Sequence, residues 1–381
     1  MRPALRLRVR RFLATLLALP LALLVGTATG AVAAPPSAAQ AMPGRHLEGM
    51  TRNLYLGADL TPLVSAKTPD AVQMAIGAIL GQVVASDPPK RMAWVADEIA
   101  AQRPDLVGLQ EAALWHIQTP AGGTITYDFT QLVIDALAAQ GLHYRVAVTQ
   151  TNFDSAVQLA GAPLPARFAD RDVILVNADA GTPEVRVLDK GAAHYASQLV
   201  FPTLLGAVDF ARGYVYVDVK SWGRTWRFVN THFEAYPGFG PMPHDYTSDQ
   251  ARELLSVLPA GMPTVIAGDL NSRRDNPLLQ GAAVLMDEGG FADAWTGLHP
   301  GDPGYTCCRA GNLAGGELDE RIDYVVTRGD VVPTSAARVG VEPVAATAPR
   351  WPSDHAGVVA GIAVGPQPKG VGTGLLVGSR S

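Results

Sequence analysis

Short apolar runs, many of them ending in a polar or charged residue, recur along the chain from residue 47 to residue 364. Runs that are rich in β-branched and aromatic residues predict strands, and apolar positions three or four residues apart predict helices. The predicted strands are 47–56, 106–109, 171–177, 213–220, 224–235, 264–267, 321–328 and 353–364. The predicted helices are 91–102, 129–140 and 248–258, with a partly helical insertion at 57–90. Several successive strands leave no room for a crossover helix, so the pattern favours antiparallel or mixed sheets over a doubly wound parallel sheet.

The first 33 residues predict a secretory signal peptide. Arginines precede an apolar run, 12–25, that is too short to span a bilayer, and Ala31-Val32-Ala33 gives an A-x-A cleavage pattern. We therefore expect a secreted protein that is cleaved near Ala33, with a disordered linker at 34–46, one domain at 47–364 and a flexible tail at 365–381. An uncleaved membrane anchor would need a longer apolar core. Charge, Gly or Pro interrupts every later apolar run, so we expect no transmembrane segment.

Removal of the leader makes the chain distinctly acidic. The leader carries five of the 30 basic residues and none of the 35 acidic ones, which leaves a net charge of −10. An acidic surface binds nucleic acid weakly, because non-specific binding depends on basic side chains that neutralise the phosphates. The only cysteines are the adjacent Cys307 and Cys308, so no disulfide links distant parts of this fold. Export favours a bond between these two, and the alternative is a pair of partly buried thiols.

Polar side chains that suit metal and phosphate chemistry lie in or beside the predicted strands. They are Asn53, Glu111, His232, Asp269, Asn271, Asp323, Asp354 and His355. Each alone fits an ordinary turn, cap or satisfied core position. Together they supply hard oxygen ligands, amides and imidazoles, which a divalent-metal phosphoester site needs.

The segments that hold these residues resemble the motif series of the endonuclease/exonuclease/phosphatase family. They are "LQE" at 109–111, "NTH" at 230–232, "GDLN" at 268–271, "RIDYV" at 321–325 and "SDH" at 353–355, in the family's order. The "NTH" histidine is similar to the deoxyribonuclease and sphingomyelinase branches. Where abasic-site endonucleases have aromatic residues, this chain has "GYTCCRAGNL" at 304–313. The resemblance implies an α/β four-layer sandwich, in which two packed mixed or antiparallel β-sheets are flanked by helices and the site lies at one rim.

The resemblance also implies a metal site. Glu111 resembles the family's principal magnesium carboxylate, with Asn53 and Asp354 in support. Mg²⁺ is the expected cofactor, and Mn²⁺ is an alternative. Magnesium prefers oxygen ligands and retains several waters, so few protein ligands are expected.

The remaining roles concern proton transfer and phosphate binding. Asp269 resembles the residue that orients or deprotonates the attacking water, and Asn271 and His355 resemble the groups that bind the phosphate. The resemblance pairs His232 with Asp323 as a histidine–carboxylate unit. It leaves open which group is the general base.

We expect a secreted, divalent-metal-dependent phosphodiesterase, acting as a single copy of the chain on a lipid or small phosphodiester. The alternatives are an extracellular endonuclease, a phosphomonoesterase and a non-catalytic binding module on the same fold. Arg171 is a candidate phosphate contact, with a solvated strand-edge charge as the alternative. Tyr236, Phe239, Met242 and Tyr246 in the loop 236–247 suit a peripheral membrane contact or base stacking, or form a lid on the protein's own core.

Overall fold

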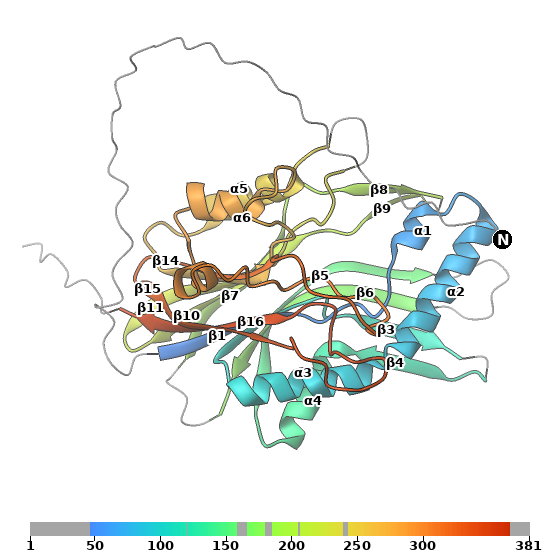
Figure 1. Ribbon diagram of the computed structural model, residues 1–381, viewed down its shortest axis with the longest axis horizontal. Coiled ribbons are helices and arrows are strands. Elements are labelled where there is room, and N and C mark those ends of the chain that lie inside the picture. Colours follow the sequence, from blue (N-terminus) through green and yellow to red (C-terminus); the bar gives the residue numbers. More distant parts are fainter. Residues whose placement is uncertain are drawn as a thin grey trace, which may run out of the picture. The chain divides into compact units, whose positions relative to one another are not determined.

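The computed structural model describes residues 46–119, 121–157, 166–179, 185–204, 206–238 and 243–365 (Figure 1). The chain divides into a unit at 1–35 and a unit at 36–381, and every described residue belongs to the second. The predicted signal peptide, most of the predicted linker, the tail beyond Gly365, Phe239 and Met242 lie outside the described residues. Within the described part, no helix is both long enough and apolar enough to cross a membrane.

The larger sheet has 8 strands in the order β15-β16-β1-β2-β6-β3-β4, with β5 also paired to β6. Their bounds are β1 His46–Asn53, β2 Leu106–Gln110, β3 Leu114–Gln118, β4 Thr124–Asp128, β5 Tyr144–Val157, β6 Ala166–Asn177, β15 Val331–Val339 and β16 Gly357–Val364. β1 and β2 run parallel, whereas the other described pairings of this sheet are antiparallel.

The second sheet has 6 strands in the order β13-β14-β12-β11-β10-β7. Their bounds are β7 Arg186–His194, β10 Gly213–Ser221, β11 Arg224–His232, β12 Thr264–Asp269, β13 Ala292–Asp293 and β14 Asp323–Arg328. Only β11 and β12 pair in parallel here. A separate hairpin joins β8, Val200–Thr203, to β9, Gly206–Asp209. The mixed and antiparallel sheets confirm the predicted fold class.

Helices cover the outer faces of both sheets, and side chains that accept hydrogen bonds from the backbone begin several of them. The helices are α1 Thr61–Ser65, α2 Pro69–Ala85, α3 Pro88–Gln102, α4 Phe129–Ala139, α5 Tyr246–Val257, α6 Gly281–Ala283, the π-helical turn η2 Val284–Glu288 and α7 Ala294–Leu298. Thr68 caps α2, Asp87 caps α3 and Asp128 caps α4, each satisfying a free N–H of the first turn. The predicted insertion at 57–90 contains α1, α2 and the start of α3.

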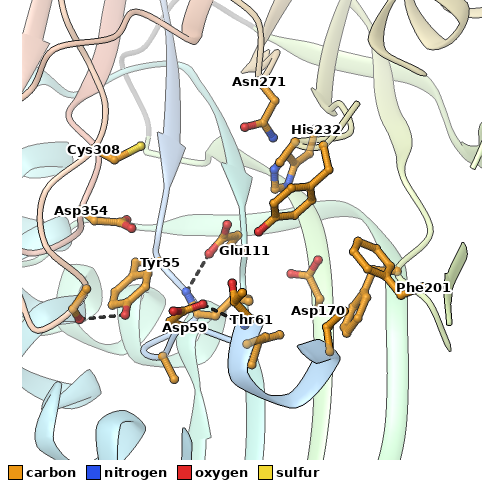
Figure 2. Close-up of a pocket in the computed structure, with 18 of the residues that line it drawn as sticks. Tyr55, Asp59, Thr61, Glu111, Asp170, Phe201, His232, Asn271, Cys308 and Asp354 are labelled. Carbon is orange, nitrogen blue, oxygen red and sulfur yellow. Dashed lines mark hydrogen bonds between the residues drawn. The ribbon is translucent and has the colours of Figure 1, made fainter. Parts of the chain in front are cut away.

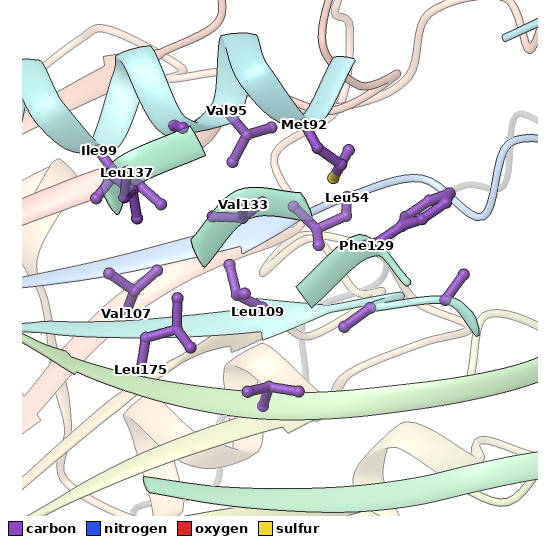
Figure 3. Close-up of a cluster of buried hydrophobic side chains, with 14 of the residues drawn as sticks. Leu54, Met92, Val95, Ile99, Val107, Leu109, Phe129, Val133, Leu137 and Leu175 are labelled. Atoms are coloured by element: carbon purple, nitrogen blue, oxygen red, sulfur yellow. The ribbon is translucent and has the colours of Figure 1, made fainter. Parts of the chain in front are cut away.

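Buried apolar side chains form one cluster between each pair of layers. Figure 3 shows the first, where Met92 and Ile99 of α3 and Val133 of α4 pack on Leu109 and Leu175 of the larger sheet. A second cluster, which includes Leu106, Val217, Phe228 and Ile362, lies between the two sheets. A third, which includes Leu254, Ile266 and Leu285, lies beneath α5 and η2. The order is therefore helices, sheet, sheet, helices, as predicted.

Asn230 of β11 ties the two sheets together through polar contacts inside this apolar stack. Its Nδ2 donates to the carbonyl oxygens of Leu109 and Val173, both at 2.9 Å, and its Oδ1 accepts from Gln110 Nε2 at 2.6 Å. Gly108 makes room, since a Cβ there would lie 2.9 Å from the Asn230 side chain. The contacts of Asn230 therefore fix how the sheets register, and with them the rim where the predicted site residues lie.

Candidate active site

Strand pairing brings the predicted residues to one edge of the stacked sheets. β1 and β2 are parallel, so Asn53 and the residue that follows β2, Glu111, come out at the same edge. In the second sheet the register places His232 opposite Asp269 and Asp269 opposite Asp323. A cavity of about 720 Å³ lies at this edge (Figure 2), and Asn53 and Asp323 are not part of its lining. Of the predicted residues, Glu111, His232, Asp269, Asn271, Asp354 and His355 line it.

Asn53 connects the two sheets at this rim. Its Nδ2 donates to Glu111 Oε1 at 3.2 Å and to Asp269 Oδ2 at 3.0 Å. The backbone N–H of Leu56 donates to the other Glu111 oxygen at 2.8 Å. The amide nitrogen of Asn53 thus faces the carboxylates and orients them, and its Oδ1 already accepts from the backbone of Tyr55. Its role as a metal ligand stays a prediction.

Three residues of the rim hold left-handed backbone conformations that L-residues seldom adopt. Tyr55 has φ 58°, Glu111 has φ 51° and Asn271 has φ 45°. Each directly follows a strand end or lies within two residues of one. Such conformations cost about 1–3 kcal/mol and persist where the surroundings enforce them, often at functional sites. Here they turn the Glu111 and Asn271 side chains towards the cavity.

Glu111 and Asp354 form a negative end of the cavity. Burial raises the pKa of Glu111, and the nearby charge of Asp170 raises it further. Burial also raises the pKa of Asp354 to about 6, and Glu111 adds to that rise. Both carboxylates point into the cavity in Figure 2. Hard oxygen donors that are desolvated beside other acids suit a divalent cation, which would offset their charge. The residues present therefore fit a Mg²⁺ or Mn²⁺ ion.

His355 and Asp323 form a buried ion pair. His355 Nδ1 lies 2.9 Å from Asp323 Oδ2, and both side chains are at most 7% exposed. Burial alone would lower the pKa of His355, but the negative charges of Asp323, Asp354 and Asp269 raise it well above the ordinary value. The raised pKa favours the imidazolium form of His355, which lines the cavity. Thr306 fixes its partner by accepting from the Asp323 backbone N–H at 3.1 Å.

The predicted pairing of His232 with Asp323 is wrong. Across β11, β12 and β14, Asp269 lies between these two residues, and Asp323 instead bonds to His355. His232 Nε2 lies 3.6 Å from Asp269 Oδ2, and Arg212 Nη1 lies 3.0 and 3.1 Å from its ring nitrogens. Burial and the charge of Arg212 lower the pKa of His232 well below the ordinary value. The lowered pKa favours the neutral imidazole form of His232.

Arg212 is a cavity residue that the sequence pattern did not single out. It lies just before β10, and its side chain is 13% exposed. Burial would lower its pKa, yet the carboxylates of Glu234, Asp170, Glu111 and Asp172 together raise it. It is therefore a fixed cation among acids that come from three separate segments. In the sequence, Arg212 ends the tripeptide "FAR" just before a strand, and this tripeptide is not part of a recognisable motif.

Asp269, the last residue of β12, and Asn271, which follows it in a left-handed conformation, both line the cavity. Asp269 Oδ1 accepts from the Asn271 N–H at 2.9 Å, and Asn271 Nδ2 donates to the carbonyl of Phe233 at 2.9 Å. Burial and the charge of Asp323 raise the pKa of Asp269 to about 7. This carboxylate is 1% exposed and can take up or release a proton near neutral pH.

Arg171 does not line the cavity, which corrects its predicted contact with the substrate phosphate. Its Nε donates to the carbonyl of Ala112 at 2.8 Å, and its Nη2 donates to Asp128 Oδ1 at 2.6 Å. Side chains alternate along β6, so Asp170 faces the cavity and its neighbour Arg171 faces away. Arg171 instead holds the turn that carries Glu111.

Cys307 and Cys308 are bonded to each other in the structure. Cys307 Sγ lies 3.6 Å from His355 Nε2, and Cys308 lines the cavity. Tyr55 closes the same side, and its hydroxyl donates to the carbonyl of Gly311 at 2.7 Å. The loop before β14 therefore forms one wall of the site.

Comparisons with known proteins agree with this fold. A family model described as the Endonuclease/Exonuclease/phosphatase family matches residues 79–355. An endonuclease/exonuclease/phosphatase structure from Beutenbergia cavernae is 23% identical with a TM-score of 0.52, covering 86% of this chain and 73% of its own. A family protein from Leptotrichia buccalis is 13% identical with a TM-score of 0.52, covering 83% and 99%. One from Bacteroides thetaiotaomicron is 16% identical with a TM-score of 0.50, covering 84% and 98%. None of the curated proteins matches the chain significantly.

Proposed function

The chain belongs to the endonuclease/exonuclease/phosphatase family, whose members hydrolyse phosphoester bonds. On that premise we propose that it is a secreted phosphodiesterase that depends on a divalent metal and acts on a lipid or small phosphodiester. One observation carries the proposal. A pair of buried carboxylates, an imidazolium and a carboxylate with a pKa of about 7 meet in one cavity.

Enzymes of this family typically use a divalent metal. In this chain Glu111 and Asp354 would hold it, with Asn53 keeping Glu111 in place. When bound, Mg²⁺ or Mn²⁺ would neutralise charge that develops on the phosphoryl oxygens. Phosphoryl transfer needs mainly positioning and charge stabilisation, with little covalent help from the protein. The protein's own groups supply the rest.

His355 and Asn271 stabilise the phosphoryl group. Asp323 keeps His355 protonated and fixes its ring, so its Nε2–H can donate to a phosphoryl oxygen in the cavity. Asn271 lines the same cavity, and its bond to the carbonyl of Phe233 sets the direction of its amide. Neither group needs to reorganise during the reaction, which is the main advantage of such a preorganised site.

Asp269 is our choice for the group that accepts the proton of the attacking water. Its pKa of about 7 matches the working range of a general base. Neutral His232 is the other candidate, but both of its ring nitrogens lie within 3.1 Å of Arg212, which disfavours proton uptake. His232 instead packs beside Asp269 and positions it.

The substrate preference rests on charge. The chain without its leader carries −10, and the cations among the cavity-lining residues are Lys67, Arg212 and the His355 imidazolium. A protein that follows a duplex needs several cations along the phosphate backbone. Tyr236 lines the mouth of the cavity and is 44% exposed, which suits contact with a lipid or an organic substituent. Secretion is proposed from the leader sequence, which favours an extracellular substrate.

A side-by-side assay with Mg²⁺ tests the proposal. The substrates are bis-(p-nitrophenyl) phosphate, sphingomyelin vesicles, soluble inositol phosphates, RNA and plasmid DNA. We expect turnover of the small or lipid diesters and none after treatment with EDTA. Fast plasmid nicking at physiological salt, without turnover of the other substrates, would instead identify an extracellular endonuclease. Binding without turnover of any substrate would identify a non-catalytic module.

A further inference from the structure

The cavity extends from the catalytic cluster into an apolar region that we call the side chamber. Its walls are Leu60, Val64, Phe168, Phe201, Phe210 and Tyr236. They come from the start of α1, from β6, from the β8–β9 hairpin and from the segment after β11. In Figure 2, Phe201 lies on the opposite side of the cavity from Asp354 and Tyr55. The cavity thus has a polar end and an apolar end.

The aromatic wall of the side chamber is built into the core. Trp115 stacks on Phe168 at 4.2 Å between centroids, and Phe168 meets Phe153 at 5.7 Å. Phe153 stacks on Phe210 at 4.5 Å. The row then continues from Phe210 through Phe201 to Tyr236, with 5.8 Å at each step. Because each ring is fixed by its neighbours, the wall is preformed and loses little freedom when something binds against it.

The catalytic groups proposed above make no use of this apolar surface, and of its six residues only Tyr236 entered the substrate argument. Apolar area in contact with water costs about 25 cal/mol per Å² relative to burial. A concave apolar surface that is continuous with a reactive cluster is the usual form of a ligand-binding site. Thr61, Ser65 and Lys67 are exposed at the mouth on this side, and Asp170 lies beside Phe201 in Figure 2. Within the walls, the Tyr236 hydroxyl is the single polar side-chain group.

We propose that the side chamber binds an apolar substituent of the phosphoester, an alkyl chain or an aryl ring, while the phosphate lies against the catalytic cluster. The proposal rests on the proposed function only in placing the phosphate. A nucleobase is a poorer fit, because its ring edge needs several hydrogen-bond partners, whereas the six wall residues supply one hydroxyl and Asp170 beside them adds one carboxyl group. A cavity of about 720 Å³ holds a phosphate with a ring or a short chain.

Inhibition by a homologous series of monoesters tests this directly. Inorganic phosphate and methyl, butyl, hexyl, octyl and phenyl phosphate compete with bis-(p-nitrophenyl) phosphate in Mg²⁺ below their micelle concentrations. A monoester has one substituent, so only that group can fill the chamber. We expect Ki to fall by about two- to fourfold per methylene while the chain enters the chamber, and then to level off.

Val64 is the clearest position for variants. It is half-buried on α1, a helix with no fully buried residue, so substitution there leaves the core clusters intact. Val64→Asn should flatten the dependence of Ki on chain length, and Val64→Phe should exclude the longer chains. Tyr236→Ala, at an exposed position, is a second test of the wall. The matched control is Val84→Ser, an exposed valine on α2 outside the cavity, which should keep the wild-type slope.

The outcomes separate this inference from the proposed function. A flat series in an enzyme that hydrolyses the diester would overturn the side chamber and leave the function standing. If no diester is hydrolysed, calorimetric titration with the same monoesters replaces the inhibition assay, and a chain-length slope there supports the chamber alone. Thymidine 5′-phosphate binding more tightly than phenyl phosphate would show that a nucleobase occupies the chamber and would overturn the proposal.

Discussion

His355 is paired with Asp323 across 2.9 Å, and this contact decides which of the two site histidines carries a charge. His232 lies beside the cation of Arg212 and stays neutral, whereas His355 faces acids and is protonated. Both rings lie near Asp269 Oδ2, His232 at 3.6 Å and His355 at 3.8 Å. Of the two, the charged ring of His355 is the one suited to stabilise a phosphoryl oxygen.

Asp323→Asn tests this relationship. The amide cannot offset an imidazolium, so the pKa of His355 should fall and kcat should drop by about 100-fold or more. NMR titration of the His355 ring measures the first effect, and diester hydrolysis measures the second. The control is Asp319→Asn, at an exposed position in the loop before β14. An unchanged His355 titration in a folded variant would show that the pair does not set its charge.

Glu111→Gln tests the metal site. The amide keeps the size of the side chain, including an oxygen for the Leu56 N–H, but removes the charge. We expect the affinity for Mg²⁺ and Mn²⁺ to fall by more than about 100-fold, and activity to fall with it. That loss exceeds the roughly 10- to 100-fold that is typical when a residue that only supports a metal ligand is changed. Calorimetric titration with each ion measures binding. The matched control is Asp59→Asn, an exposed acid that lines the mouth of the cavity, and equal losses in both variants would argue against a specific site.

The pH profile follows from the two shifted groups. Asp269 must be ionised to accept a proton, so kcat/KM should rise with pH until its pKa of about 7 is passed. A bound cation lowers the pKa of nearby carboxylates, so the rising limb should move to lower pH as Mg²⁺ is added. The raised pKa of His355 delays its deprotonation, which puts the falling limb well above the ordinary histidine range. A pH-independent kcat/KM across both limbs would exclude these roles.

Asn230→Ala should destabilise the whole domain rather than the chemistry alone. The change leaves the Gln110 side chain and the carbonyls of Leu109 and Val173 without their buried partner. Buried unsatisfied groups cost about 1–3 kcal/mol each, so we expect a loss of about 3 kcal/mol or more in urea unfolding. Asn312→Ala, in an exposed loop, should cost less than about 0.5 kcal/mol. Similar losses in both would show that Asn230 does not tie the sheets together.

The strands nearest the site were predictable because they are buried on both faces. β2 and β12 are continuous apolar runs in which every residue is buried, so their polar ends stood out in the sequence. β7 alternates between exposed and half-buried residues, and β5 carries two register shifts, so neither has a clear apolar pattern. The predicted strand at 353–364 begins only at Gly357, because Ser353 Oγ accepts from the His355 N–H and forms a turn.

The sequence predicted most of the residues that meet at the candidate site, but it did not predict which of them pair with each other. Which side chains pair with each other depends on the register of β11, β12 and β14, and the pattern of residues along the sequence does not contain that register. This explains why Asp323 was predicted beside the wrong histidine. For Arg171, the sequence does not show which of the two faces of β6 is turned towards the cavity. Arg212 was missed because its significance comes from acids on other segments, and a lone arginine before a strand has no signature of its own.

Arg212→Met gives the most demanding test of the site's electrostatics. Arg212 offsets the charges of Glu234, Asp170 and Asp172, and removing one partner of a buried ion pair typically costs about 3–5 kcal/mol. Burial raises the folded-state pKa of Asp170 and Asp172 above the unfolded value, and the loss of Arg212 would raise both further. The folded variant then binds more protons than the unfolded chain, so its stability should fall as pH rises from acid to neutral.

The same substitution should raise the pKa of His232, because Arg212 is one of the charges that lower it. Urea unfolding between about pH 4 and pH 8 measures the stability difference from wild type, which we expect to be smallest in acid. NMR titration measures the His232 shift. Arg167→Met is the control, since Arg167 forms a solvent-exposed pair with Asp154 and its substitution should change the free energy of unfolding little at any pH. A destabilisation of Arg212→Met that does not change with pH would mean that Arg212 acts through packing, and that the acids around it do not depend on its charge.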